Sequence, residues 1–145
     1  MIAACSIGSP NTFSLSNASV DASHTCAVGA INVSYDLHGA IDVHNGTANA
    51  VTIRSVDATL TLAAVKGGWL QKVGDAYDAG SATFTASSVG AGANTALALT
   101  VRSWCTGRAT GSPVAWGDYA VTFTMATSAG TFKVTSRDRH RIVTA

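Results

Sequence analysis

The sequence predicts an all-β protein, a single antiparallel β-sandwich of seven to nine strands. Its 145 residues include no Glu and only three Lys, while Thr, Val, Ser, Ala and Gly are abundant. Residues that favour surface helices are therefore scarce, and residues that favour strands and turns dominate. Apolar and polar side chains alternate in short segments that Gly, Asn, Ser and Pro clusters separate, which is typical of sandwiches and barrels.

The N-terminal third of the chain contains two predicted strands. Residues 12–16 point Phe13 and Leu15 toward the core. Residues 31–45 alternate apolar and polar side chains over their whole length. A two-residue hairpin at Gly39 would mix the polar and apolar faces, and a three-residue loop would set two Asp residues opposite each other. We therefore predict one long strand, bent at Gly39.

The residue pattern in the middle of the chain predicts an irregular strand. In residues 51–62, Val51 and Ile53 stand at odd positions, whereas the apolar residues from Val56 onward stand at even positions. One extra residue in a strand produces such a switch, so we predict a β-bulge or a change of sheet at Arg54 and Ser55. The remaining strands are predicted at 81–86, 95–105 and 118–126, through Phe132 and Val134, and in a last stretch that ends in Ile142 and Val143.

Charge and hydropathy exclude several classes of partner. The net charge is +1, so we expect no nucleic-acid partner. No apolar run approaches the roughly 20 residues that a membrane span requires. The length predicts one domain, residues 1–145, with 1–11 as an N-terminal arm. The opening MIAACSIGSP lacks a signal peptide's features. We therefore expect a protein used in the cytoplasm, in a particle assembled there, or one whose leader was removed.

The segment WGDYAVTFTMATSAGTFKV, residues 116–134, resembles the final hairpin of bacterial and phage immunoglobulin-like domains. NGTANAVTIRSVDATLTL, residues 45–62, is similar to their central strands. The resemblance implies an immunoglobulin-like sandwich. It also implies that Tyr119 is a corner tyrosine, whose hydroxyl bonds back to the chain.

Three cysteines, Cys5, Cys26 and Cys105, make an odd count without a C-x-x-C pair, which disfavours zinc fingers and ribbons. The resemblance implies that Cys26 and Cys105 pair across the sandwich, although two buried thiols are an equal alternative. Trp104 lies beside Cys105 and not midway between the cysteines, which departs from antibody domains. His24 lies two residues before Cys26 and would point the same way along a strand.

The polar positions of the alternating segment 31–45 include two Asp-x-His pairs, which are a candidate metal or acid/base site. In one long strand the pairs lie about 20 Å apart from end to end, too far for one ion. We therefore interpret them as a solvated face. His38 or His44 would be a metal ligand only where a neighbouring strand supplies another ligand.

Two further sets of side chains are candidate binding sites. Four basic residues stand at odd positions near the C-terminus and would lie on one face of a strand: Lys133, Arg137, Arg139 and Arg141. This pattern predicts either a cationic stripe that binds an anionic partner or charges that protect an edge strand from aggregation. The segments 65–80 and 106–117 are predicted as long loops, and they carry three aromatic residues that could stack on sugars, anchor a protein or cap the core. These are Trp69, Tyr77 and Trp116.

The sequence matches no template of hydrolases, zinc proteases or phosphate-binding loops, so we expect no enzyme and no cofactor. The leading hypothesis is a structural or assembly module, a virion surface or decoration protein or another self-assembling subunit, with a second copy or a capsid surface as partner. The alternative is an extracellular immunoglobulin-like domain of a secreted bacterial protein that binds glycans or proteins. The expected location is accordingly the virion or the cell exterior.

Overall fold

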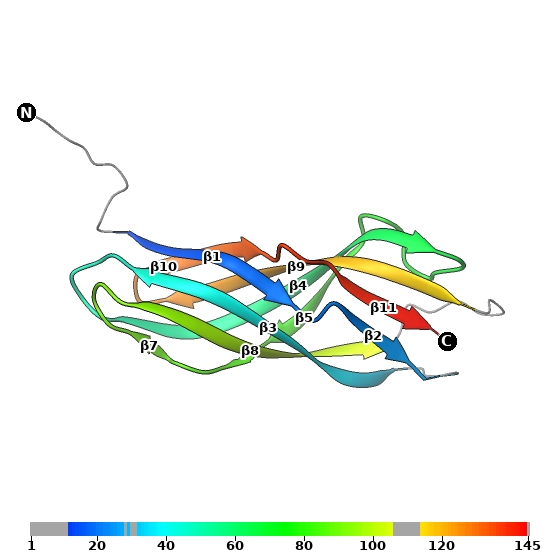
Figure 1. Cartoon of the computed structure of the whole chain (residues 1–145), viewed down its shortest axis with the longest axis horizontal. Coiled ribbons are helices and arrows are strands. Elements are labelled where there is room, and N and C mark those ends of the chain that lie inside the picture. Colours follow the sequence, from blue (N-terminus) through cyan, green and yellow to red (C-terminus); the bar gives the residue numbers. More distant parts are fainter. Residues whose placement is uncertain (1–11, 28, 30–31, 106–113, 145) are drawn as a thin grey trace, which may run out of the picture.

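The computed structural model describes residues 12–27, 29, 32–105 and 114–144. They form eleven strands that run along the long axis of the molecule (Figure 1). The strands are β1 (Phe13–Val20), β2 (Ser23–Cys26), β3 (Val33–Asn45), β4 (Val51–Lys66), β5 (Ala76–Ser81), β6 (Thr83–Phe84), β7 (Ser88–Val89), β8 (Asn94–Cys105), β9 (Ala115–Thr127), β10 (Gly130–Thr135) and β11 (His140–Thr144).

The smaller sheet has the strand order β1-β3-β8-β6. Its central strand β3 confirms one long strand across residues 33–45, and the register with β8 passes through Gly39 without a shift. Close packing favours glycine at position 39. A Cβ on Gly39 would lie 3.0 Å from the carbonyl oxygen of Ser19 and 3.2 Å from Cζ of Phe123.

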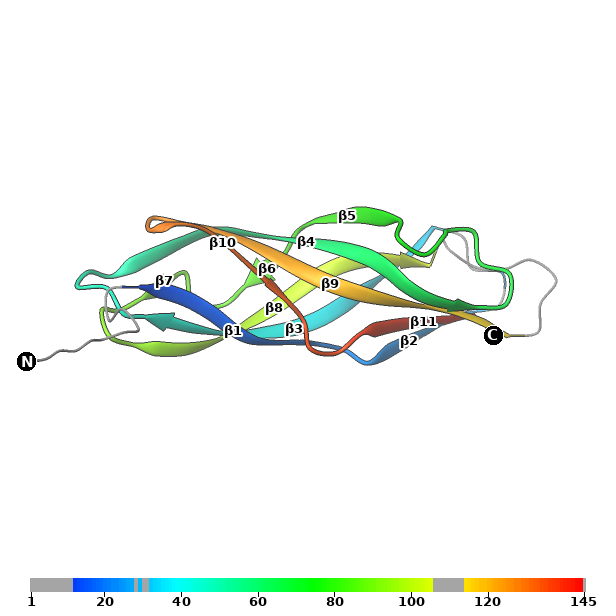
Figure 2. The same cartoon turned by 90° about the horizontal axis from the view of Figure 1, so that it is seen from above.

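The larger sheet has the order β2-β11-β9-β4-β5, with β10 paired to β9 and β7 to β4 (Figure 2). The prediction of a purely antiparallel sandwich is wrong at one edge, because β2 pairs with β11 in parallel. The chain leaves the smaller sheet after Val20 and enters the larger sheet at Ser23. It keeps its direction while doing so, and it therefore runs alongside the last strand.

The predicted number of strands, seven to nine, is too low for the described residues, for two physical reasons. The first long strand is interrupted and forms β1 and β2, and the last long strand is interrupted and forms β10 and β11. In addition, β6 and β7 are only two residues long. Even so, the two strand orders correspond to the ABED sheet and the extended GFC sheet of immunoglobulin-like domains, with β2 added at an edge. The all-β, immunoglobulin-like sandwich is confirmed.

The core follows the predicted alternation, and the register between paired strands shifts at four points of the described chain. The register between β4 and β9 shifts between Ile53 and Ser55, which confirms the bulge predicted there. A second shift, between Ser16 and Ser19, was not predicted. At this point Asn17 adopts a φ of 54°, and the strand continues to Val20 instead of ending at Ser16.

A disulfide joins the two sheets. Cys26 on β2 bonds to Cys105 on β8, and this confirms the pairing that the resemblance implied. Both cysteines are buried. The bond differs from the B–F disulfide of antibody domains, because β8 occupies the E position and β2 is an added edge strand.

Candidate functional site

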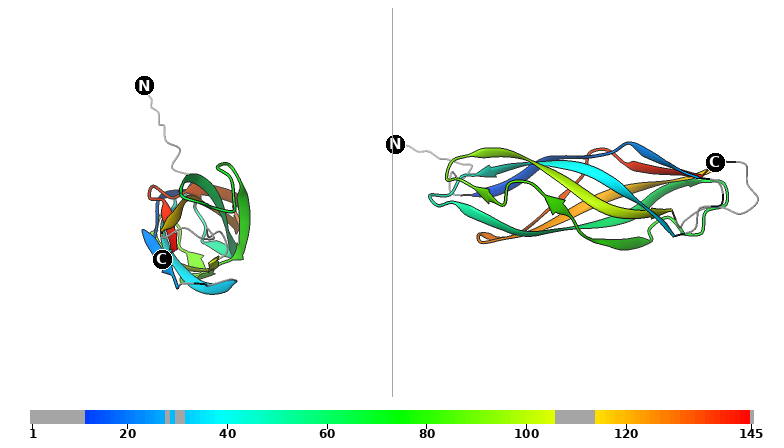
Figure 3. Two further views of the ribbon diagram at one scale, coloured as in Figure 1. Left: turned by 90° about the vertical axis from the view of Figure 1, so that its right-hand side faces the viewer. Right: turned by 90° about the horizontal axis from the view of Figure 1, so that it is seen from below.

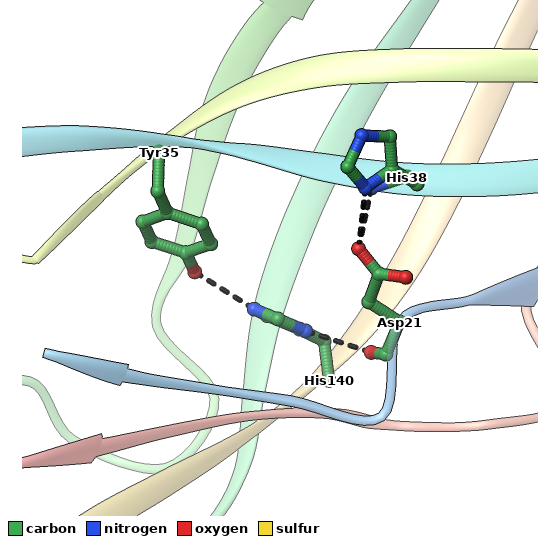
Figure 4. Close-up of polar contacts among 4 residues, drawn as sticks. All are labelled: Asp21, Tyr35, His38 and His140. Atoms are coloured by element: carbon green, nitrogen blue, oxygen red, sulfur yellow. Dashed lines mark hydrogen bonds and ion pairs between the residues drawn. The ribbon is translucent and has the colours of Figure 1, made fainter.

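A chain of hydrogen bonds links Tyr35, His140, Asp21 and His38, from the buried imidazole of His140 to the exposed side chain of His38 (Figure 4). The Tyr35 hydroxyl lies 2.7 Å from Nε2 of His140, and Nδ1 of His140 lies 2.8 Å from the carbonyl oxygen of Asp21. The carboxylate of Asp21 accepts hydrogen bonds from the backbone N–H and from Nδ1 of His38, both at 2.9 Å. Asp21 lies between β1 and β2, so the network joins both sheets at the point where the chain changes sheet.

The partners fix the proton positions on His140. A carbonyl oxygen only accepts, so Nδ1 carries the proton, and Nε2 of the neutral ring accepts from the Tyr35 hydroxyl. Burial lowers the pKa of His140 and raises the pKa of Tyr35 above its usual value. His140 has an exposed fraction of 0% and both ring nitrogens are bonded, so this histidine joins strands and is closed to a substrate.

Two further tyrosines line the same half of the core. The hydroxyl of Tyr77 lies 3.1 Å from Oγ of Ser103, and burial raises the pKa of Tyr77. Tyr119 accepts a hydrogen bond from Nε1 of Trp69 at 3.0 Å and donates one to Gln71. Burial raises the pKa of Tyr119 to about 12. Among the described residues, every buried side-chain nitrogen and oxygen has a partner, so this network supports the fold.

Tyr119 differs in detail from the corner tyrosine that the resemblance implied. Its hydroxyl does bond back to the chain, but to the side chains of Trp69 and Gln71, 50 and 48 residues upstream. The usual partner of a corner tyrosine is backbone a few residues upstream. Here the contact instead fixes the segment 67–75 against β9.

The three predicted loop aromatics are distributed differently from the prediction. Tyr77 lies on β5 and Trp116 on β9, so the expectation that both lie on loops is wrong. The alternating pattern of short strands is easily lost in a stretch rich in Gly, Ala and Asp. Trp69 does lie between strands, half-buried, with its indole N–H bonded inward. Trp69 and Tyr77 pack against the core, whereas Trp116 lies beneath the guanidinium of Arg141, and the proposed role of the three in ligand binding stays a prediction.

The basic residues do not form the predicted single row. Lys133 is on β10 and Arg141 on β11, while Arg137 and Arg139 lie in the connection between these strands. The pattern failed because the strand is interrupted. Arg141 forms a two-pronged ion pair with Asp118, at 2.6 and 2.9 Å, and its guanidinium lies 3.8 Å from the ring centre of Trp116. The other three are exposed, and no ion pair involves them in the described part of the chain.

The histidines of β3 face solvent, as the solvated-face interpretation requires. His38 pairs with Asp21, and Nδ1 of His44 lies 2.6 Å from Oδ1 of Asn94. In the described chain no third His, Cys, Asp or Glu joins either of them in a metal-sized cluster. His44 lines a shallow concavity of about 380 Å³ on the smaller sheet, together with Asp42 and Asn94.

Exposed apolar side chains lie toward the end of the sandwich where β11 terminates, on more than one face of the molecule, a feature that the sequence did not reveal. This surface, called the apolar tip below, contains every large apolar side chain found exposed among the described residues, with exposed fractions from 37% to 69%. Figures 1 and 3 show that the end of β4, the end of β8 and the beginnings of β3 and β9 meet there. Its members are Val33, Val65, Leu70, Val73, Trp104 and Val114.

The signal for this surface was present in the sequence. Val65, Leu70 and Val73 lie in a segment that we predicted to be a loop, where apolar side chains have no core to enter. Val33 and Trp104 follow the strand alternation, but they lie where β3 begins and β8 ends. Recognising the surface required knowing that these strand ends converge.

Comparison with known proteins gives remote structural similarity only. No protein-family model matches the chain, and no curated protein matches it. Among solved structures, the PapD-like domain 7 of human CEP192 aligns with a TM-score of 0.38 and 16% identity, covering 99% of this chain and 92% of that one. AggA, the major subunit of aggregative adherence fimbriae type I from Escherichia coli, aligns with a TM-score of 0.37 and 10% identity, covering 93% and 97%. The CooA pilin subunit of enterotoxigenic Escherichia coli aligns with a TM-score of 0.36 and 12% identity, covering 90% and 98%.

The strands account for the regular structure of the described residues. No helix in that part of the chain is long and apolar enough to cross a membrane.

Proposed function

We propose that the protein is a non-catalytic assembly module that works outside the reducing cytoplasm, and that it binds another protein subunit through the apolar tip. The observation that carries the proposal is the collection of six exposed apolar side chains at one end of the molecule. Apolar side chains that gather on a surface mark interaction sites, whereas isolated ones are normal. Trp104 adds the type of side chain that most often anchors a protein interface.

The disulfide supports the location. Cys26 and Cys105 are both buried and bonded, and bonds of this kind persist in oxidising compartments. Of the two predicted settings, an extracellular protein fits this chemistry directly. A virion surface and a capsid partner stay predictions, as does a glycan ligand.

A second copy of the chain is the first partner to test. The oxidised full-length chain is analysed by sedimentation velocity over a range of concentrations. The variant carries Leu70→Asp with Val73→Asp, and we expect the concentration-dependent species of the wild type to disappear. The matched control carries Ala91→Asp with Ala129→Asp, two exposed positions in the turns at the opposite end. Equal association of both variants contradicts the proposal.

If the wild-type chain is monomeric, the proposed partner is a different protein subunit. In that case a photo-crosslinking residue is placed at position 70 or at position 129 of the chain in its native host. The proposal predicts one discrete crosslinked protein from position 70 and none from position 129. Crosslinks of equal yield from both positions, or none from position 70, would reject the apolar tip as the binding surface.

A further inference from the structure

His24, Cys26 and Cys105 form a cluster whose chemistry exceeds that of a structural disulfide. His24 and Cys26 are two residues apart on β2, so their side chains project from the same face of the strand. Cys105 reaches them from β8 across the interior. One imidazole nitrogen and the two sulfur atoms all lie within 4.8 Å of one another.

The imidazole of His24 is held in place but makes no hydrogen bond to any described residue. Its ring stacks on that of Tyr35, with centroids 3.7 Å apart and an angle of 5° between the planes. Within the described part of the chain, neither ring nitrogen of His24 makes a hydrogen bond. The side chain is partly exposed, whereas both sulfurs are buried. One ring nitrogen of this partly exposed side chain therefore lies next to the sulfurs without a hydrogen bond to the described part of the chain.

We propose that the reduced form of this cluster is a three-ligand site for a thiophilic metal ion of the Zn²⁺ type. Two thiolates and one imidazole are ligands that Zn²⁺ prefers, and a tetrahedral site leaves a fourth position for water. Zinc bonds of this kind place two ligand atoms about 3.5–4 Å apart, so side-chain adjustments within the present cluster suffice. The entry path is the partly exposed edge of His24.

The reaction balances with a dithiol as the external reductant. Two electrons and two protons convert the Cys26–Cys105 bond into two thiols, and the dithiol becomes a disulfide. Each thiol then loses its proton as its sulfur binds the ion, so two protons leave per metal bound. His24 contributes the lone pair of one ring nitrogen to the ion. The newly made chain passes through the same dithiol state before its disulfide forms.

Cobalt binding tests the proposal, because Co²⁺ reports its own ligands. The full chain with Cys5→Ser is reduced, the reductant is removed under anaerobic conditions, and the protein is titrated with Co²⁺. We expect one ion per chain with release of two protons as Co²⁺ binds, a sulfur-to-cobalt charge-transfer band, the visible spectrum of a four-coordinate ion, and displacement of the bound Co²⁺ by Zn²⁺ without further proton release. The oxidised chain should show none of these signals.

The variants separate this site from adventitious binding. His24→Phe keeps a ring against Tyr35 and removes one ligand, so it should weaken Co²⁺ binding at least about tenfold. His44→Phe, an exposed histidine on β3, should bind as the parent does. Circular dichroism follows folding in each sample. The proposal fails when the folded reduced chain binds no stoichiometric Co²⁺, or when His24→Phe binds it equally well. It also fails when reduction unfolds the chain and the metal does not restore the native spectrum.

Discussion

Gly117 packs directly against the indole ring of Trp69. A Cβ at position 117 would lie 2.7 Å from Cε2 and 2.8 Å from Nε1 of this ring. The contact explains why β9 carries a glycine in an otherwise regular strand. It also explains how the segment 67–75, with Leu70 and Val73 of the apolar tip, is held in place.

Gly117→Ala should therefore destabilise the protein. The added methyl forces the Trp69 ring outward and strains its hydrogen bond to Tyr119, at a cost of about 1–3 kcal/mol in the free energy of unfolding. Urea denaturation measures the loss. Gly90→Ala is the control, because a Cβ there has no atom within 4 Å. Equal stabilities of the two variants would show that Trp69 does not restrict position 117.

Acid should weaken the fold through His140. The pKa of His140 is lowered in the folded state, chiefly by burial; the hydrogen bond to the Asp21 carbonyl opposes this shift, and the proximity of His24 adds to it. Below about pH 6.5 the unfolded chain therefore binds more protons than the folded one. The stability contributed by neutral His140 is fully present above this pH and is lost as the pH falls through 6.5 toward the folded pKa.

The measurement is the free energy of unfolding at several pH values between 4.5 and 8, compared with that of two variants. His140→Gln should lose about 1–3 kcal/mol at neutral pH because it leaves a buried polar atom unpaired, and its acid-dependent decline should be smaller. His44→Gln should keep the decline of the wild type. If the free energy of unfolding of His140→Gln falls with acid as much as that of the wild type, groups other than His140 cause the fall.

The three tyrosines should resist ionisation together. The chain has three, Tyr35, Tyr77 and Tyr119, and burial raises the pKa of each. Ultraviolet titration of the folded protein should show little tyrosinate at pH 10, with Tyr119 ionising at about 12. In concentrated urea all three should titrate near 10. A folded-state transition of one full tyrosine near 10 would contradict the network.

Removing the disulfide should be costly. The bond closes a loop between cysteines 79 residues apart, so Cys26→Ala with Cys105→Ala should lower the free energy of unfolding by about 2–5 kcal/mol. Chemical denaturation under identical conditions gives the difference. Cys5→Ser should have no comparable effect, since the bond does not involve it. An equally large loss in Cys5→Ser would show that this third cysteine takes part in stabilising the fold.

Alternation in the sequence was sufficient for the long strands. It placed Leu97, Leu99 and Val101 in the core and detected the bulge near Ser55, because a single face of each strand is buried. The break between β10 and β11 was not predictable from the same pattern. Lys133 and Arg141 keep one parity across it, although the chain leaves the sheet between them.

The candidate sites were less predictable because they depend on contacts between distant segments. Asp21 shows no motif in the sequence, yet its backbone and side chain bond to His140 and His38, which lie on different strands. Asn45 ends the alternating segment 31–45, and the sequence shows no role for its amide. In the structure it is fully buried, and its amide donates to the carbonyl oxygens of Asn49, Val89 and Gly90.

The parallel pairing of β2 with β11 has a mechanical consequence. β1 begins near one end of the long axis and β11 ends at the other (Figures 1 and 3). Tension applied between these two points pulls β2 and β11 in opposite directions along their length. Their ladder, from Ser23 with Arg141 to Cys26 with Thr144, is then loaded in shear, and its hydrogen bonds must fail together instead of one at a time. The edge that departs from the antiparallel pattern is thus oriented to carry force along its strands.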